Sequence, residues 1–391
     1  MKNLLMFLFC SIIMALMAGV GDSFVKNPAD GVDKAVEAYV QNAIDSICKT
    51  VNVVGLHAII VKDTSIIGNY TYGNALYCAN GIGICDTVEL GGRIELWKVA
   101  SVSKNVIAMA VMCLYDDGFL DLEGDINNYL SYDVHNPSFP DAPITVEMLL
   151  SHYSSISQGY YNLKSYKGVQ FTSDCPGSRY AYSNINYLLL AQIIEHVTGQ
   201  RFDEYVKDRI FDNIGVFASF NPYEIDMSSI IYGMWLEPRT NKLSICDVLQ
   251  SYNKNDIDNY ILEESTKGLD PSGGLIITIS GMAKYMMLCM DVYAPENKGV
   301  VSDSSMARMR VPRSGLKKYG LGTLDYSYII KGENMYGHTG YAYGIYTSMI
   351  YNPEKRYGFV IFCNGAEINY STALATLHAP IIKVLYNAYL K

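Results

Sequence analysis

The chain has 391 residues, of which 50% are hydrophobic and only 18% charged, so it can bury a large core and is not a disordered protein. Thirty basic residues against 39 acidic ones give a net charge of −9. No basic run stands out, which argues against nucleic acid as a partner. The length allows one large domain or two smaller ones.

The N-terminal residues have the pattern of a secretory signal peptide. Met1-Lys2-Asn3 is a short positive start, Leu4 to Ala18 is a continuous apolar run, and small residues follow it. We expect residues 1–23 to be the signal peptide, cleaved between Ala18 and Ser23, and residues 24–391 to form the exported domain. The alternative is an uncleaved membrane anchor, although the run is just short of a comfortable membrane span.

The nine cysteines fit an oxidising compartment. Cys78 and Cys85 flank a glycine-containing loop and are the best candidates for a disulfide. Cys113, Cys289 and Cys363 lie in apolar segments and are expected to be buried thiols. No Cys-x-x-Cys or His-x-x-x-His spacing indicates a metal site.

The first predicted elements are a helix, a hairpin and a second helix. Apolar residues at helical spacing predict an amphipathic helix over 32–50, and residues 55–61 and 65–72 indicate two strands joined by a turn. Residues 78–89 are expected to form a glycine-rich loop. From Val102 to Leu114 nearly every residue is apolar, and a glycine follows at 118, which predicts a helix buried on all sides.

The middle of the chain is predicted to be mostly helical, with long loops. Thr145 is a capping residue for a short helix that ends at Ser151. Further helices are expected over 186–199, 202–210 and 280–293, the last after a short apolar run.

Towards the C-terminus the pattern changes to strands, which we expect at 320–328, 345–351 and 359–363, and an apolar helix over 372–390 closes the chain. Strands and a helix at each end, with helices between them, predict an α/β domain interrupted by a helical insertion. The predicted division places the sheet-containing part at about 33–120 and 319–391 and the helical part at about 121–318.

Ser101 and Lys104 are the candidate nucleophile and its base. They are three residues apart at the first turn of the buried helix, and therefore on one face. Burial lowers the pKa of an ammonium group towards that of a usable base, and a helix N-terminus favours developing negative charge. The same Ser-x-x-Lys spacing recurs at Ser23, Ser46, Ser251 and Ser314. Only at Ser101 does it begin a long buried helix.

Two weaker triplets complete the candidate site. In Tyr182-Ser183-Asn184 the tyrosine can transfer protons if a nearby cation lowers its pKa, and the asparagine can hold Lys104 and donate to a substrate amide. In His338-Thr339-Gly340 the glycine would let a substrate backbone lie against a strand edge. Each triplet alone is more simply a turn, and Tyr-x-Asn also occurs at Tyr72 and Tyr160.

Other histidines are interpreted as structural. His57 and His196 lie in apolar segments and are expected to be satisfied core histidines. His152, followed by a tyrosine and two serines, is another candidate polar group, although a structural role is the simpler interpretation.

Taken together, the three signature elements resemble those of the penicillin-recognising serine hydrolases. The Tyr-x-Asn element looks like the branch with class C β-lactamases, serine D-Ala-D-Ala carboxypeptidases, D-aminopeptidases and related esterases. Four further stretches look typical of that branch, at 118–122, 144–152, 193–200 and 271–275. The resemblance covers roughly Asp33 to Leu390. It implies a β-lactamase/transpeptidase-like fold, an antiparallel sheet flanked by helices with an all-helical insertion.

The resemblance also implies a role for each matching residue. Ser101 would be the acylated nucleophile, Lys104 its activating partner and Tyr182 the general base or acid. The oxyanion hole would consist of the backbone N–H groups of Ser101 and Tyr341. Substrate would be bound by Asn184, His338, Thr339 and Gly340, and His338 and Thr339 would also support Tyr182.

One departure concerns His338, where class C β-lactamases usually have lysine. Histidine is a weaker permanent cation at neutral pH, which disfavours tight binding of a β-lactam carboxylate.

The prediction is therefore a secreted or periplasmic serine hydrolase that acts through an acyl-enzyme on amide or ester bonds, with D-amino-acid peptides as the first substrate class. It would need no cofactor, and it would contact a membrane only through an uncleaved N-terminal segment. The alternatives are a carboxylesterase or β-lactamase on the same scaffold, or an inactive protein that binds peptide or cell-wall ligands.

Overall fold

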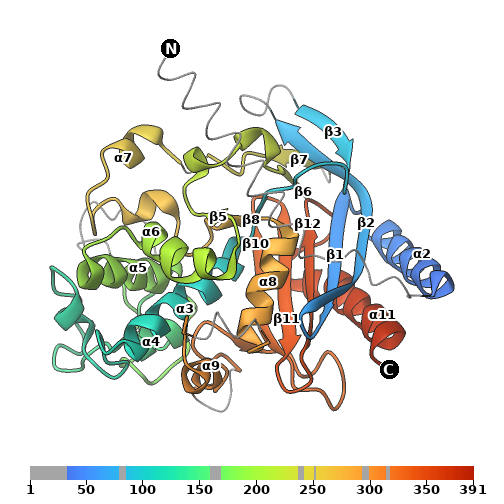
Figure 1. Ribbon diagram of the computed structural model, residues 1–391. Helices are drawn as coiled ribbons and strands as arrows, with labels where there is room; N and C mark the ends of the chain where they lie inside the picture. Colours follow the sequence, from blue (N-terminus) through green and yellow to red (C-terminus); the bar gives the residue numbers. More distant parts are fainter. Residues whose placement is uncertain are drawn as a thin grey trace.

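The computed structural model describes seven segments of the chain, namely residues 33–78, 85–158, 169–236, 242–250, 252–292, 299–313 and 318–391. The predicted signal peptide and Tyr160 lie outside these segments. Within them, no helix combines the length and the apolar character that crossing a membrane requires. A sheet with helices on both faces lies beside a group of helices (Figure 1).

Seven antiparallel strands form the main sheet, in the order β3-β2-β1-β12-β11-β10-β9. Because β1 pairs with β12, strands from the N-terminal and C-terminal parts of the described chain lie side by side in the middle of the sheet. The strands are β1 (Gly55–Lys62), β2 (Ser65–Cys78), β3 (Cys85–Glu89), β9 (Leu324–Asp325), β10 (Tyr336–Ala342), β11 (Ile345–Asn352) and β12 (Tyr357–Cys363).

Helices cover both faces of this sheet, so its central strands are buried at nearly every position. Every residue of β11 and β12 is buried. Helices α2 (Lys34–Thr50) and α11 (Ala379–Tyr389) pack against each other on one face, and α8 (Ile279–Cys289) packs on the other (Figure 1). An amphipathic helix such as α2 is stable only where its apolar stripe meets such a surface.

The remaining elements make up the second part of the molecule and the connections. The helices are α3 (Ser103–Asp116), α4 (Val146–Ser151), α5 (Asn184–Thr198), α6 (Phe202–Val206), α7 (Lys254–Asp258), α9 (Asp303–Met309) and α10 (Tyr370–Ala373). Short strands pair as β4 (Trp97–Lys98), β8 (Ile276–Ile277) and β5 (Ala218–Ser219), and as β6 (Gly233–Leu236) and β7 (Leu243–Cys246). The predicted division at about 121 and 318 stays a prediction, and α8 packs on the sheet although it lies inside the range 121–318.

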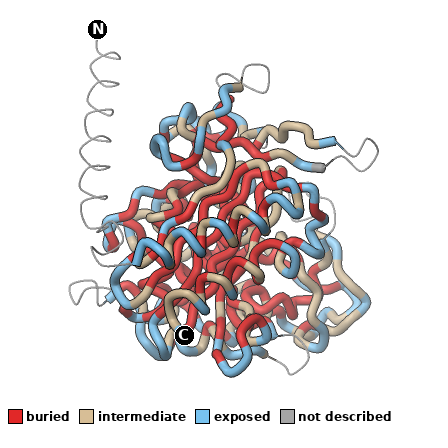
Figure 2. The backbone as a smooth tube through the Cα atoms, turned by 90° about the vertical axis from the view of Figure 1, so that its right-hand side faces the viewer, coloured by how far each residue is buried: buried red, intermediate tan, exposed pale blue. Residues whose placement is uncertain are grey.

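Helix α3 is the buried helix that the sequence predicts. Every residue from Ser103 to Leu114 is buried, and Gly118 follows in the left-handed region with a φ of +78°. The helix packs against α5, α6 and α9, and its first residues contact β10. Figure 2 shows the buried part of the chain running through the middle of the molecule, with exposed segments on the outside.

Several predicted elements differ from the structure, each for a physical reason. Residues 85–89 form β3 rather than loop, because Cys78 and Cys85 pair across the hairpin and are joined by a disulfide. Of residues 320–328 only β9 is extended, because Gly322, with a φ of +65°, makes a tight turn in which Gly320 N–H donates to Thr323 O.

The interpretation of His196 is wrong. It lies on α5, as predicted, but on the exposed side, where it bonds to Glu263 at 3.0 Å. The buried polar residue at this point of α5 is its neighbour Glu195. His57 is buried as expected, between Glu95 at 2.9 Å and Asn69 at 2.6 Å.

Candidate active site

Ser101 lies in a sharp turn that joins β4 to α3. The turn is a 3-10 helix from Ala100 to Val102, and Ala100 has a φ of +49°, which is rare for a residue with a side chain. Such a conformation persists only where the surroundings hold it. Here Ser103 Oγ donates to Ala100 O at 2.7 Å and accepts from Leu275 N at 3.1 Å. The turn leaves Ser101 partly exposed between two buried neighbours.

Lys104 points its ammonium group at the Ser101 hydroxyl. Its Nζ is 3.1 Å from Ser101 Oγ and donates to the carbonyl oxygen of Ser272 at 2.6 Å. The side chain is fully buried, and burial lowers the pKa of Lys104 to about 7, with the charge of Asp270 acting in the opposite direction. A lysine in this state can accept a proton near neutral pH.

Tyr182 reaches the same hydroxyl from the other side. Its OH donates to Ser101 Oγ at 3.0 Å. Its ring lies 4.3 Å from the ring of His152, measured between centroids, and 5.1 Å from Lys104 Nζ. Burial raises the pKa of Tyr182, and the hydrogen bond to Ser101 lowers it by less. The phenol therefore stays protonated at neutral pH.

His152 is a structural residue of the site. It is fully buried at the end of α4, with a φ of +62°, and its Nδ1 lies 3.2 Å from the N–H of Ser183 and 3.0 Å from Asn186 Nδ2. These contacts fix the ring on which Tyr182 packs.

Gly340 brings strand β10 against the turn that contains Ser101. A Cβ at this position would be 2.5 Å from Val99 O and 2.9 Å from Ser101 N, so only glycine fits. Among the described residues, β9 pairs with β10 only at Tyr336 and Gly337. The edge of β10 from His338 onward is thus beside Ser101, and no strand of the described segments pairs with it there. The predicted triplet 338–340 lies within a strand, not in a turn before one.

His338 and Thr339 point to opposite faces of β10. His338 Nδ1 lies 2.6 Å from the carbonyl of Thr339, to which it donates, and its Nε2 accepts from Tyr319 OH at 3.0 Å. Burial, and secondly the nearby charge of Lys104, lowers the pKa of His338 to about 3, so it is a neutral imidazole. Its hydrogen-bond partners are Tyr319 and Thr339 rather than Tyr182. Thr339 Oγ1 is 3.1 Å from Tyr326 OH.

Asn184 is the first residue of α5, which Ser183 caps. Its Oδ1 is buried and has no hydrogen-bond partner within the described part of the chain. The ammonium of Lys104 donates to the Ser272 carbonyl rather than to Asn184, and Ser272 was not singled out from the sequence. The only signal for it was the Pro-Ser-Gly-Gly stretch at 271–274.

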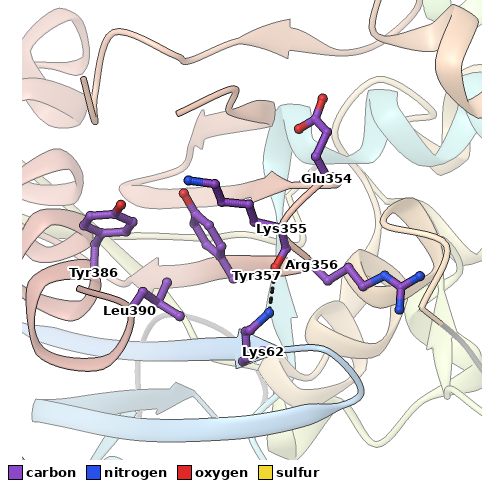
Figure 3. Close-up of a pocket in the computed structure, with 7 residues that line it drawn as sticks. All are labelled: Lys62, Glu354, Lys355, Arg356, Tyr357, Tyr386 and Leu390. Atoms are coloured by element: carbon purple, nitrogen blue, oxygen red, sulfur yellow. Dashed lines mark hydrogen bonds between the residues drawn. The ribbon is translucent and has the colours of Figure 1, made fainter. Parts of the chain in front are cut away.

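A cavity of about 370 Å³ lies apart from these residues, beside the turns that follow β1 and β11 (Figure 3). Both of its lysines have partners, since Lys62 Nζ donates to Lys355 O at 2.7 Å and Lys355 Nζ to Glu333 at 2.6 Å. None of the candidate site residues lines it. Within the described residues, no cluster of His, Cys, Asp and Glu is arranged to hold a metal ion.

Comparison with known proteins gives one family and a consistent fold. The family described as Beta-lactamase matches residues 93–380. The chain is 24% identical over 313 residues to penicillin-binding protein 4 of Amycolatopsis lactamdurans, covering 73% of this chain and 75% of the relative. It is 26% identical over 195 residues to a putative D-alanyl-D-alanine carboxypeptidase of Escherichia coli O157:H7, covering 43% of each. The chain thus spans less than half of that relative.

Among solved structures, the D-amino acid amidase of Ochrobactrum anthropi SV3 in complex with D-phenylalanine superposes with a TM-score of 0.67. The sequence identity is 18%, and the match covers 91% of this chain and 100% of the amidase. At this identity the likeness concerns the fold alone. The antiparallel sheet flanked by helices is therefore the β-lactamase-like fold that the sequence predicts.

Proposed function

The chain belongs to the Beta-lactamase family, and on that premise we propose that it is a serine hydrolase that forms an acyl-enzyme at Ser101. One observation carries the proposal. Lys104 Nζ and Tyr182 OH converge on Ser101 Oγ at 3.1 and 3.0 Å. A hydroxyl held between a base and a proton donor is the arrangement that nucleophilic catalysis needs.

The two partners of Ser101 take different roles, because burial moves their pKa values apart. Lys104, with its pKa lowered to about 7, accepts the proton of Ser101 as Oγ attacks the substrate carbonyl carbon. Tyr182, whose pKa is raised, stays protonated and gives its proton to the leaving group. The proton that Lys104 received from Ser101 then passes to the Tyr182 phenolate, so that both side chains become neutral again. Water then attacks the acyl-enzyme with the proton transfers reversed. The water gives up a proton, the Ser101 oxygen takes one back, and the carboxylic acid is released.

The oxyanion of the tetrahedral intermediate would be bound by the backbone N–H groups of Ser101 and Tyr341. Support for this comes from Gly340, whose close approach places the Ser101 amide beside β10. Asn184, with a buried side-chain oxygen that lacks a partner, would accept the N–H of a substrate amide. Each donor of an oxyanion hole contributes about 10²–10³ in rate.

We infer that peptides or amides of D-amino acids are the preferred substrate class. The support is the activity named for two proteins that resemble this chain, a putative D-alanyl-D-alanine carboxypeptidase and a D-amino acid amidase. The neutral state of His338 gives little attraction for a β-lactam carboxylate, so β-lactamase activity is the less favoured reading. The disulfide between Cys78 and Cys85 is in keeping with an exported protein.

Intact-mass spectrometry tests the proposal. The protein, Ser101→Ala and Ser46→Ala are mixed separately with a penicillin, a D-amino-acid amide and a reactive p-nitrophenyl ester. Ser46 is a matched control, since it has the same spacing to a lysine but lies exposed on α2. We expect an acyl adduct on the wild type and on Ser46→Ala, and none on Ser101→Ala.

Two results would contradict the proposal. An equal adduct on Ser101→Ala would remove Ser101 as the nucleophile. No adduct and no turnover with any of the three compounds would favour a binding protein. Turnover of the ester without the amide would instead identify a carboxylesterase on the same scaffold.

A further inference from the structure

Lys98 is a second buried lysine, three residues before the nucleophile. It lies on β4, is 1% exposed, and has its Nζ 3.5 Å from Asp270 Oδ2. The same ammonium donates to Val248 O at 3.3 Å and faces the rings of Tyr252 and Tyr343 at 4.7 and 4.4 Å. A buried ammonium needs such partners, and Asp270 is its one carboxylate at ion-pair distance in the described structure.

Asp270 organises the turn that follows it. Its backbone has a φ of +47°, and its carbonyl accepts the N–H groups of Gly273 at 3.0 Å and Gly274 at 2.6 Å. Its Oδ1 accepts from Ser272 Oγ at 2.9 Å. Ser272 in turn offers its carbonyl oxygen to Lys104 Nζ at 2.6 Å.

An unbroken series of contacts therefore leads from one buried lysine to the other. It runs from Lys98 through Asp270 and Ser272 to Lys104, and ends at Ser101 Oγ. We propose that Asp270, held by Lys98, is a positioning residue for Lys104, because it fixes the turn whose Ser272 carbonyl receives the Lys104 ammonium. The effect on catalysis rests on the proposed function, whereas the positioning of Lys104 does not.

The charge of Asp270 adds an electrostatic effect with a definite sign. The groups that face Lys104 are Ser101, Tyr182, Tyr187, His152, His338 and Asp270. Burial keeps both of these histidines neutral by lowering their pKa values. Asp270 is the one described carboxylate whose charge raises the pKa of Lys104. Removal of that charge lowers the pKa of Lys104 further.

Lysine-selective NMR measures the effect of Asp270 on Lys104 without requiring any turnover. The protein is labelled with ¹³C-lysine, the Lys104 signal is assigned by its loss in Lys104→Met, and it is titrated in the wild type and in Asp270→Asn. We expect the midpoint in Asp270→Asn to fall by on the order of half a unit or more. The pH at which acylation reaches half of its maximum should fall by the same amount.

Ser272→Ala tests the effect of the turn on Lys104 separately from the effect of the Asp270 charge. It removes the hydrogen bond to Asp270 and keeps the carboxylate, so the Lys104 midpoint should move less. The maximal acylation rate should still fall about tenfold, because the carbonyl that holds Lys104 is no longer fixed. Asp203→Asn is the matched control, since Asp203 is a buried carboxylate paired with Arg201 at 2.7 Å, away from the site. It should leave the midpoint and the acylation profile unchanged.

Asp270→Asn leaves the charge of Lys98 buried without its partner, which could destabilise the fold. The double variant Lys98→Met/Asp270→Asn is therefore measured beside it, because it removes that unpaired charge as well. The double variant should still acylate about tenfold more slowly than the wild type. Wild-type acylation by the folded double variant, or an unchanged Lys104 midpoint in both Asp270→Asn and Ser272→Ala, would overturn the proposal. A shifted midpoint in a protein that forms no adduct would uphold the coupling of Asp270 to Lys104 and refute the proposed hydrolase.

Discussion

Burial sets the protonation state of each ionisable residue around Ser101. It lowers the pKa of Lys104 to about 7 and that of His338 to about 3, and it raises the pKa of Tyr182. Of these three groups, only Lys104 changes charge near neutral pH. The pH dependence of acylation should therefore report this one lysine.

We predict that acylation becomes faster as the pH rises through about 7 and then levels off. The direction of this pH dependence follows from the role of the amine, since only unprotonated Lys104 can accept the Ser101 proton. The unprotonated form is lost as the pH falls. Lys104→Met should lower the acylation rate by about 10²–10⁴ and remove the rising limb. Single-turnover kinetics with a p-nitrophenyl ester between pH 5 and about 9 measures both effects.

Lys49→Met is the matched control for that experiment. Lys49 follows Ser46 at the same spacing but is exposed on α2, so its loss should leave the profile unchanged. A rising limb that persists in Lys104→Met would assign the titration to another group.

For single residues of the candidate site, the sequence predicted those that would act through their side chains. Ser101 and Lys104 stood out because the pair opens a long apolar helix, and the structure brings Tyr182 to them. The contribution of Ser272 is a backbone carbonyl, which has no side-chain signature. His196 was misread because its neighbour Glu195 is the buried residue, satisfied by four donors, namely Phe202 N, Tyr260 OH, Glu263 N and Thr266 Oγ1.

Among the elements, β10 was hardest to predict although it forms one wall of the site. Its seven residues include Gly337 and Gly340, and glycine is depleted in strands because it offers no side chain to pack. Strands β1, β2, β11 and β12 were predicted because they are rich in β-branched and aromatic residues. The glycines of β10 are explained by contacts with distant residues, which a local pattern does not contain.

We predict that Gly340→Ala disables the site while the fold survives. The new Cβ would be 2.5 Å from both Val99 O and Thr347 Oγ1, so β10 or the nucleophile turn must move. A displacement of about 1 Å at a catalytic group costs on the order of 10² in rate. Acylation by a reactive ester should fall by about that factor, as followed by intact mass over time.

Gly268→Ala is the comparison for this change, because a Cβ at Gly268 meets no atom within 4 Å. That variant should acylate like the wild type, and both variants should show a cooperative thermal transition. Normal acylation by Gly340→Ala would mean that β10 does not approach Ser101 as closely as the structure has it.

For the molecule as a whole, the site depends on segments far apart in the sequence. The sheet joins residues from Gly55 onward to residues that end at Cys363, and α2 and α11 cover one face of it together. The apolar periodicity of both helices could be predicted, since each has one buried stripe. Their mutual packing and the strand order could not, because both are set by long-range contacts.

Helix α2 is therefore expected to be part of the fold. Asp33 caps α2 by accepting the Ala35 N–H at 2.9 Å, and Val40, Ile44 and Cys48 are each 0% exposed. We predict that a chain of residues 24–391 unfolds cooperatively and forms the acyl adduct. Within that chain Ile44→Ala should cost about 2–5 kcal/mol of the free energy of unfolding, which is a large share of a typical total of about 5–15 kcal/mol.

Tyr39→Ala supplies the contrast on the same helix, because Tyr39 is 61% exposed and its loss should change the free energy of unfolding by no more than about 0.5 kcal/mol. Urea denaturation followed by circular dichroism compares the three chains. Equal midpoints for Ile44→Ala and Tyr39→Ala would show that α2 does not contribute its buried stripe to the core. A loss confined to Ile44→Ala would mean that the fold needs α2, so a folded chain must include the residues from Asp33 onward for the sheet behind Ser101 to hold.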